Sequence, residues 1–219
     1  MPTSFPGSPR LLKGGIVLID PESSAVQRVI PLQYNPESIS RTLEVQGAEA
    51  GGEGDRSESL RLKGPPVETL TLEVEIDAAD GLEEGEQVAA EVGLSAHLAA
   101  LETIVYPKSA RLTSNNSLAN LGTLEIVPMQ APLTLFVWSR NRLMPVRVTQ
   151  MQITEDAFDP DLNPLRAKIN LSLRVLSVDD LGFSHKGGSL YMIYQQQKER
   201  LAERHPGGDL GALGIGEIP

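Results

Sequence analysis

The chain has no cysteine among its 219 residues, so it forms neither disulfide bonds nor thiolate metal sites. It has three histidines and a formal net charge of −10. The chain therefore has few side chains suited to acid–base catalysis or metal binding. It also lacks the clustered Lys and Arg of a nucleic-acid surface. No apolar run approaches the roughly 20 residues that span a bilayer, and the first residues lack a signal-peptide pattern. These absences favour a soluble cytoplasmic protein without nucleic-acid binding or membrane insertion.

Strongly alternating apolar and polar residues mark the stretches 133–138 and 168–175. A period of two is typical of a strand with one buried and one wet face. A third strand begins near Val146, but its apolar phase slips before Met151, which predicts a bulge near Thr149–Gln150. Further strands are expected at 15–20, 26–34 with Pro31 marking a sheet edge or bulge, 40–46 and 70–77. The sequence predicts a mainly β protein.

Helical spacing of apolar residues replaces the alternation over residues 83–105. This predicts one helix, stopped before Pro107, that caps an open end of the sheet. Residues 108–122 are rich in Asn and Ser and predict a long loop, followed by a strand beginning at Leu124. A second helix is expected at 189–205, where the apolar stripe returns.

The composition divides the chain into three parts. Residues 1–13 are expected to form an N-terminal arm, 14–183 a β domain, and 184–219 a C-terminal helix with a flexible tail. Within the β domain, residues 47–59 combine glycine with acidic side chains and cannot build a core. They predict a mobile acidic loop, interpreted either as a disordered hairpin tip or as an arm that orders against a neighbouring subunit.

Two stretches match part of a known functional motif but lack residues that the motif requires. Residues 159–163 begin like a calcium loop, but Pro164 and Asn170 occupy the positions that require Gly and a bidentate Glu. Residues 93–97 resemble half of a nucleophile elbow, yet they lie in a predicted helix and lack the second Gly. No catalytic, cofactor or metal residue is predicted.

Glu73, Glu75 and Asp77 share one face of a predicted strand. Paired carboxylates serve glycoside hydrolysis when they converge in a cleft with separated pKa values. A solvated strand face, or a charged face between subunits, is the commoner cause of such a pattern. The sequence therefore favours a surface role for these side chains over catalysis.

The order of several short motifs resembles the tube-protein family of phage-tail-like contractile injection systems. The motifs span about residues 12–182, and their shared order and spacing are more specific than any one of them. They are LQYNP at 32–36, ETLTLEVEID at 68–77, APLTLFVW at 131–138, Phe158, and NPLRAKI at 163–169.

This resemblance implies a tail-tube fold, in which two packed antiparallel sheets form a small barrel or sandwich with a flanking helix. It also implies hexameric rings whose sheets join edge to edge into a continuous inner barrel. The size and the Tyr-Asn-Pro motif look most like the baseplate adaptor or tube-initiator branch. That branch lies between a VgrG-like spike protein and the inner-tube protein, beside other baseplate components. Many such adaptors carry a LysM domain, for which the chain after Leu181 is too short.

Three groups of residues are candidate contacts between subunits. They are Glu49, Glu53, Asp55, Arg56 and Glu58 of the acidic loop, Glu73 and Glu75 of the strand face, and Leu190, Tyr194 and Leu201 of the C-terminal helix. The leading hypothesis is a structural adaptor in a particle assembled in the cytoplasm. The alternatives are an inner-tube protomer that stacks alone, an enzyme using the strand carboxylates, and a monomeric ligand-binding barrel.

Overall fold

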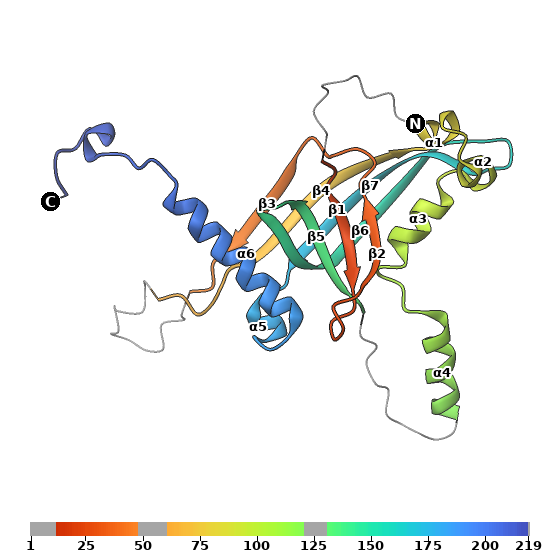
Figure 1. The fold of residues 1–219 in the computed structure, drawn as a ribbon, viewed down its shortest axis with the longest axis horizontal. Helices are drawn as coiled ribbons and strands as arrows, with labels where there is room; N and C mark the ends of the chain where they lie inside the picture. Colours follow the sequence, from red (N-terminus) through yellow and green to blue (C-terminus); the bar gives the residue numbers. More distant parts are fainter. Residues whose placement is uncertain (1–11, 48–60, 121–130, 219) are drawn as a thin grey trace.

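A single antiparallel sheet of seven strands organises the computed structural model, which describes residues 12–47, 61–120 and 131–218 (Figure 1). The strands are β1 (Gly15–Ile19), β2 (Val26–Pro31), β3 (Ile39–Glu44), β4 (Val67–Asp77), β5 (Leu133–Ser139), β6 (Arg142–Phe158) and β7 (Pro164–Val175). Their order across the sheet is β2-β1-β5-β6-β7-β4-β3. The predicted mainly β fold is confirmed, and its strands belong to one continuous sheet rather than two.

Helices decorate this sheet, and they are more numerous than the sequence predicted. They are α1 (Ala79–Glu83), α2 (Gln87–Val92), α3 (Ser95–Glu102), α4 (Ser109–Asn120), α5 (Val178–Leu181), α6 (Lys186–Glu203) and the 3-10 helix η2 (Leu210–Leu213). The helix predicted at 189–205 is confirmed as α6. It begins earlier, where the side chain of His185 accepts a hydrogen bond of 3.0 Å from the backbone N–H of Gly187 and caps the helix.

The single helix predicted at 83–105 is wrong, because three short helices, α1 to α3, take its place. Gly85 and Gly93 separate them with φ angles of +73° and +55°, values that a helix interior does not allow. At Gly93 the backbone also passes close to the β6–β7 turn, so that an added Cβ would lie 2.5 Å from the carbonyl oxygen of Pro164. Of the predicted apolar stripe, Leu94, Leu98 and Leu101 are buried, whereas Val88, Val92 and Val105 are exposed.

The loop predicted at 108–122 is also wrong, because residues Ser109–Asn120 form α4. Ser, Thr and Asn favour turns when their side chains compete for backbone groups. Here the hydroxyl of Thr113 donates to the carbonyl of Ser109, and Ser117 donates to Thr113, one turn back in each case. No residue of α4 is buried, and the helix stands away from the sheet (Figure 1). The strand expected from Leu124 lies outside the described residues.

The main core lies on one face of the curled sheet, where α3 and α6 close it. Its largest fully buried side chains come from β1, β4, β5, β6 and β7: Ile16, Leu70, Val74, Phe136, Met144, Val146, Ile169, Leu171 and Leu173. Leu98 and Leu101 of α3 and Tyr191 and Tyr194 of α6 pack on this cluster. The alternation predicted for 168–175 is thereby confirmed, with every second residue from Ala167 to Val175 buried.

Both faces of β5 are buried, whereas its alternation predicted one buried and one wet face. Leu133 and Leu135 form a second cluster with Ile19 of β1. Leu181 at the end of α5 and Leu190 of α6 pack against it. The sequence pattern of β5 could not show this cover, because it depends on helices that follow more than forty positions later.

The predicted bulge and sheet edge are both present. The register between β6 and β7 shifts between Val148 and Gln150, and the hydroxyl of Thr149 donates to the carbonyl of Ser172 at 3.0 Å. The β1–β2 hairpin forms as expected, and β2, with Pro31, lies at one end of the sheet. The bulge keeps Met151 on the same face as Val148. Residues of β6 before and after the bulge therefore pack on the main core.

Candidate functional site

Two free strand edges are the first feature with a functional meaning. Among the described residues, β2 pairs with β1 alone and β3 pairs with β4 alone, so each leaves one edge of backbone N–H and C=O groups without a strand partner. Such edges are templates for pairing with another chain. Because β2 and β3 lie at opposite ends of one sheet, the two edges could meet between copies in a head-to-tail manner.

The outer face of β4, β7 and β6 is hydrophilic. Register pairs across it bring together Thr71 with Ser172, Glu73 with Asn170, Glu75 with Lys168, Gln152 with Asn170, and Thr154 with Lys168. Hydroxyl, amide and paired charged groups thus cover this part of the sheet, here named the polar face. It is the side of the sheet opposite the main core.

The predicted contacts Glu73 and Glu75 lie on the polar face. Oε1 of Glu75 is 2.7 Å from Nζ of Lys168, and both side chains are about half exposed. This hydrogen bond, followed by the charges of Glu75 and Glu73, raises the pKa of Lys168. Both carboxylates are exposed on a strand surface rather than convergent in a cleft. The arrangement suits a solvated or contact surface and lacks the geometry of an acid–base pair.

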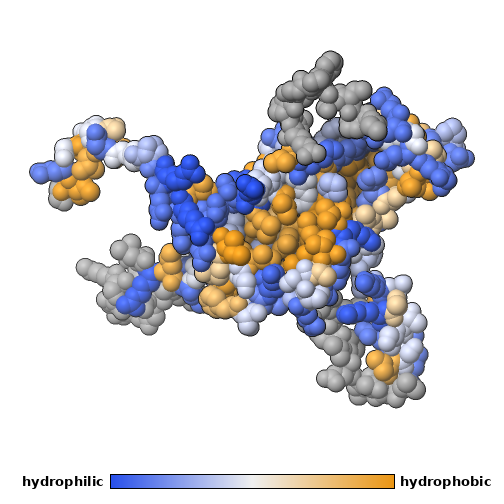
Figure 2. Space-filling view, in the orientation of Figure 1, coloured by the Kyte–Doolittle hydropathy of each residue, from blue (hydrophilic) through white to orange (hydrophobic). Residues whose placement is uncertain are grey.

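The outer face of β1, β2 and β5 is apolar instead. Its members, here named the apolar face, are Val17, Ile19, Val26, Val29, Leu133, Leu135, Val137 and Leu143. Val26 and Val29 are 61% and 59% exposed, and an apolar region covers these strands in Figure 2. Leu181 and Leu190 cover the part of this face at Ile19, Leu133 and Leu135, so its exposed part is the β2 end, and exposed apolar surface of this kind marks an interaction site. The two halves of the outer surface of the sheet therefore differ in chemistry.

A buried carboxylate fastens α6 to the sheet. Glu68 of β4 is 3% exposed; its Oε1 is 2.9 Å from Nε of Arg41, and its Oε2 is 3.0 Å from Nζ of Lys198. The hydroxyl of Tyr194 donates to Oε1 at 3.0 Å, and Nζ of Lys198 lies 4.1 Å from the centroid of the Tyr194 ring. Two strands and a helix therefore share one charged centre.

The environment of Glu68 keeps it ionised. Burial, the largest single influence, opposes ionisation. The hydrogen bond and charge of Lys198, the charge of Arg41 and the hydrogen bond of Tyr194 outweigh it and hold the pKa of Glu68 below its ordinary value. Burial and the adjacent carboxylate raise the pKa of Tyr194, so that its hydroxyl stays a donor. Sequence reasoning missed Glu68, although its position in the same alternation phase as Leu70 was a signal of burial.

The LQYNP motif holds the β2–β3 connection in place. Nε2 of Gln33 donates to the carbonyl oxygen of Asp77 at 2.8 Å, and Oε1 of Gln33 accepts from the backbone N–H of Asp77 at 2.8 Å. Asn35 likewise accepts from the N–H of Gly14 and donates to the carbonyl of Leu12, both at 2.8 Å. Each amide side chain thus substitutes for a strand partner, and the motif serves the fold.

The remaining predicted contacts fall in two regions. Glu49, Glu53, Asp55, Arg56 and Glu58 lie outside the described residues. On α6 the structure places Tyr194 in the core, 4% exposed, which differs from the expectation that it faces a neighbour. Leu190 is half-buried against the second cluster, formed by Ile19, Leu133 and Leu135, whereas Leu201 is 41% exposed. Leu201 stays a candidate contact.

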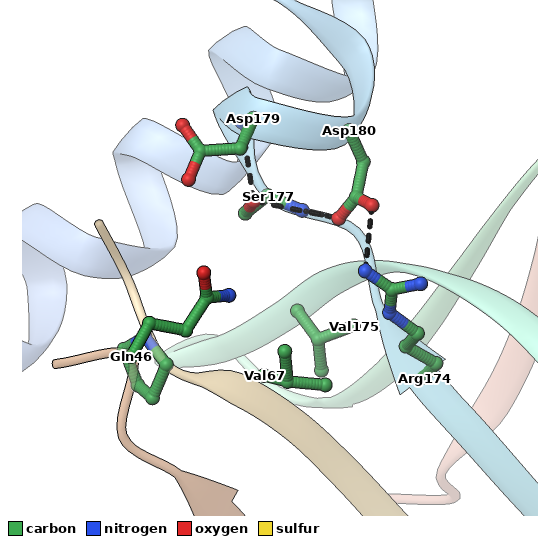
Figure 3. Close-up of a pocket in the computed structure, with 8 residues that line it drawn as sticks. Gln46, Val67, Arg174, Val175, Ser177, Asp179 and Asp180 are labelled. Atoms are coloured by element: carbon green, nitrogen blue, oxygen red, sulfur yellow. Dashed lines mark hydrogen bonds and ion pairs between the residues drawn. The ribbon is translucent and has the colours of Figure 1, made fainter. Parts of the chain in front are cut away.

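A small pocket lies where β4 and β7 meet α5 (Figure 3). Nη2 of Arg174 is 2.7 Å from Oδ1 of Asp180, whose Oδ2 accepts from the backbone N–H of Ser177 at 2.9 Å. Ser177 and Asp180 form the capping box of α5. Asp180 thus binds both Ser177 and Nη2 of Arg174, whereas Nε of Arg174 is buried without a hydrogen-bond partner among the described residues. The pocket is therefore best explained by the way α5 begins.

The stretch 159–163, which began like a calcium loop, forms the turn between β6 and β7. Oδ1 of Asp159 accepts from the backbone N–H groups of Asp161 at 2.9 Å and Asn163 at 2.8 Å. The side-chain and backbone hydrogen bonds of Asn163 lower the pKa of Asp159. Within the described ranges, no cluster of three His, Asp or Glu side chains could hold a metal ion. In the same part of the chain, no helix has the length and apolar character needed to cross a membrane.

The family model described as contractile injection system tube protein matches residues 16–181, from β1 to the end of α5. No curated protein matches the chain.

Proposed function

Because this chain belongs to the contractile injection system tube protein family, we propose that it is the structural adaptor that joins the baseplate spike to the inner tube and initiates tube assembly. The family places the chain in a phage-tail-like particle, where it assembles with copies of itself and with other components. The adaptor role rests on the LQYNP motif at 32–36 and the size of the chain, which resemble the adaptor branch. Its partners would then be a VgrG-like spike protein on one side and the inner-tube protein on the other.

Ring formation follows from the free edges. The β3 edge of one copy would pair with the β2 edge of the next, a heterologous contact that closes when the rotation per copy divides a full turn. The resemblance suggests a hexamer. This single observation, two unpaired edges at opposite ends of one sheet, carries the proposal that the working form is a ring.

The two outer faces suit such a ring in different ways. The part of the sheet that borders a water-filled interior has to be hydrophilic. The polar face, with Glu73, Glu75 and Lys168, meets that need. The exposed valines of the apolar face do not, and they are better placed against protein.

A structural role also fits the chemistry of the site better than catalysis does. The family is one of tube proteins, and Glu73 and Glu75 lie exposed along a strand. The enzyme alternative predicts a hydrolytic activity that Glu73→Gln and Glu75→Gln abolish while ring assembly stays intact. We expect neither the wild-type chain nor these variants to show hydrolytic activity.

Imaging distinguishes an adaptor from an inner-tube protomer. The purified chain should form single rings by negative-stain electron microscopy and native mass spectrometry. Long tubes should grow only when the inner-tube protein and the spike are added. Long tubes from the chain alone would assign it as the tube protomer, and a monomer at every concentration beside every baseplate component would contradict the ring.

The acidic loop has its own test, although it lies outside the described residues. Glu49, Glu53, Asp55, Arg56 and Glu58 are proposed to contact a neighbouring protomer. If they do, deletion of residues 48–57 should impair ring assembly, and the mass of the particle should fall by more than the deleted residues account for. Assembly of the intact ring from the deleted chain would remove the loop from the proposal. Assembly would take place in the cytoplasm, and the protein would leave the cell with the particle.

A further inference from the structure

The segment that follows α6 exposes apolar side chains. Within residues 209–218, Leu213 and Ile218 are 75% and 76% exposed, and Ile215 is 44% exposed. Exposed aliphatic side chains of this size gain free energy when a partner removes them from water. The glycines of this segment alternate with large aliphatic residues.

Local hydrogen bonds give this segment a defined shape. Oδ1 of Asp209 accepts from the backbone N–H of Ala212 at 2.8 Å and caps η2. The N–H of Ile215 donates to the carbonyl of Leu210 at 3.2 Å, and Gly214 closes the turn with φ of +74°. A segment shaped before binding loses less conformational entropy when it docks.

The helix α6 carries the segment away from its own sheet. Tyr191 and Tyr194 anchor the first part of α6 in the core, and Leu190 lies against the apolar cluster of β1 and β5. From there the 18-residue helix extends about 27 Å at 1.5 Å per residue. Figure 1 shows η2 well separated from the sheet at the far end of α6. The helix therefore starts beside the apolar face and delivers the segment elsewhere.

We propose that the segment 209–218 of one copy docks on the apolar face of a second copy. The apolar face presents Val26 and Val29 at the surface, and the segment presents Leu213 and Ile218. Charge supports the pairing, because Arg140 lies in the β5–β6 turn at the end of the apolar face, and Glu217 adjoins Ile218. One exposed apolar surface on each partner is thereby removed from water.

This contact differs from strand pairing between the β2 and β3 edges. It uses side chains on the outer face of the sheet, and it needs two copies but no closed ring. An assembly held by edges alone would survive loss of the segment. The two proposals can therefore fail independently.

Disulfide trapping tests the contact, and the absence of cysteine from the chain makes it specific. Full-length Leu213→Cys, carrying a mass tag, is mixed with full-length Val29→Cys under mild oxidation. The matched control replaces Val29→Cys with Leu162→Cys, an apolar position that is 79% exposed in the β6–β7 turn. We expect about tenfold more mixed disulfide with Val29→Cys than with the control, the ratio produced by about 1.4 kcal/mol of preference.

A competition experiment provides the second readout. Excess wild-type chain should suppress the mixed disulfide, whereas a chain with Leu213→Asp and Ile218→Asp should not. Equal trapping at Val29 and Leu162 would overturn the proposal. So would an intramolecular disulfide dominating in a Val29→Cys, Leu213→Cys chain diluted into wild type, because the segment would then fold back on its own sheet.

Discussion

The phenolic oxygen of Tyr194 lies 3.0 Å from Oε1 of Glu68, although 126 positions separate the two residues in the chain. This bond joins α6 to β4, and the bonds of Lys198 and Arg41 to the same carboxylate extend the link to β3. Removing one member of a buried charged group strongly destabilises the folded protein, because the remaining charge is left without compensation. The position of α6, and with it the direction of the segment beyond it, depends on this carboxylate.

Glu68→Gln should lower the free energy of unfolding by about 2 kcal/mol, since hydrogen bonds to charged groups contribute roughly 1.5–3 kcal/mol. The loss is moderated because Arg41 and Lys198 are each about one-third exposed and can turn to water. Urea unfolding followed by the fluorescence of Trp138, the only tryptophan, measures it. Glu75→Gln is the matched control and should change stability by less than about 0.5 kcal/mol, as an exposed ion pair does. Equal effects would show that burial of Glu68 has no energetic weight.

The contribution of Glu68 should depend on pH in a defined direction. Its pKa is lower in the folded protein than the ordinary value of 4.5, so the unfolded state binds the proton first as pH falls. The stabilisation is therefore complete above 4.5 and is lost as the pH falls through the lower pKa of the folded state. The difference in unfolding free energy between wild type and Glu68→Gln should be constant at neutral pH and shrink below 4.5. A difference that grows on acidification would contradict the assignment.

Gly93→Ala should destabilise the protein more than Gly85→Ala does. Both residues have positive φ, which costs an L-residue about 1–2 kcal/mol. At Gly93 the new Cβ would also meet the carbonyl oxygen of Pro164, whereas nothing lies within 4 Å at Gly85. We expect roughly 2 kcal/mol of additional loss at Gly93, typical of an overpacked contact. Thermal unfolding of the two variants side by side gives the comparison, and equal losses would mean that the turn at Pro164 moves freely.

Gln33→Ala tests whether the LQYNP motif acts through the fold. The change removes both hydrogen bonds to the backbone of Asp77 and should cost about 1–3 kcal/mol, because it leaves partly buried groups without partners. Gln152→Ala, on the exposed polar face, should stay within about 0.5 kcal/mol. Unfolding curves of both variants decide the matter. A stable Gln33→Ala chain that no longer assembles would instead place Gln33 in a contact with a partner.

The strands could be predicted because their evidence is local. Alternation located β7, and the slip of phase before Met151 located the bulge. Pro31 correctly marked β2 as a sheet edge. Each of these signals depends on neighbours a few positions away, which is the range over which a period of two can be recognised.

The helices and the charged centre depended on contacts that the sequence pattern does not contain. The break at Gly93 is set by Pro164, a residue of another element. The covered face of β5 is set by Leu181 and Leu190. Glu68 is the instructive intermediate case: its alternation phase indicated burial, but its three partners lie on β3 and α6 and could be found only in the folded chain.

The strand β4 is gripped at both ends, by the charged centre at Glu68 and by the amide of Gln33 at Asp77. Displacing β4 together with α6 would therefore break its hydrogen bonds to both β3 and β7, so the three strands and the helix are held as one unit.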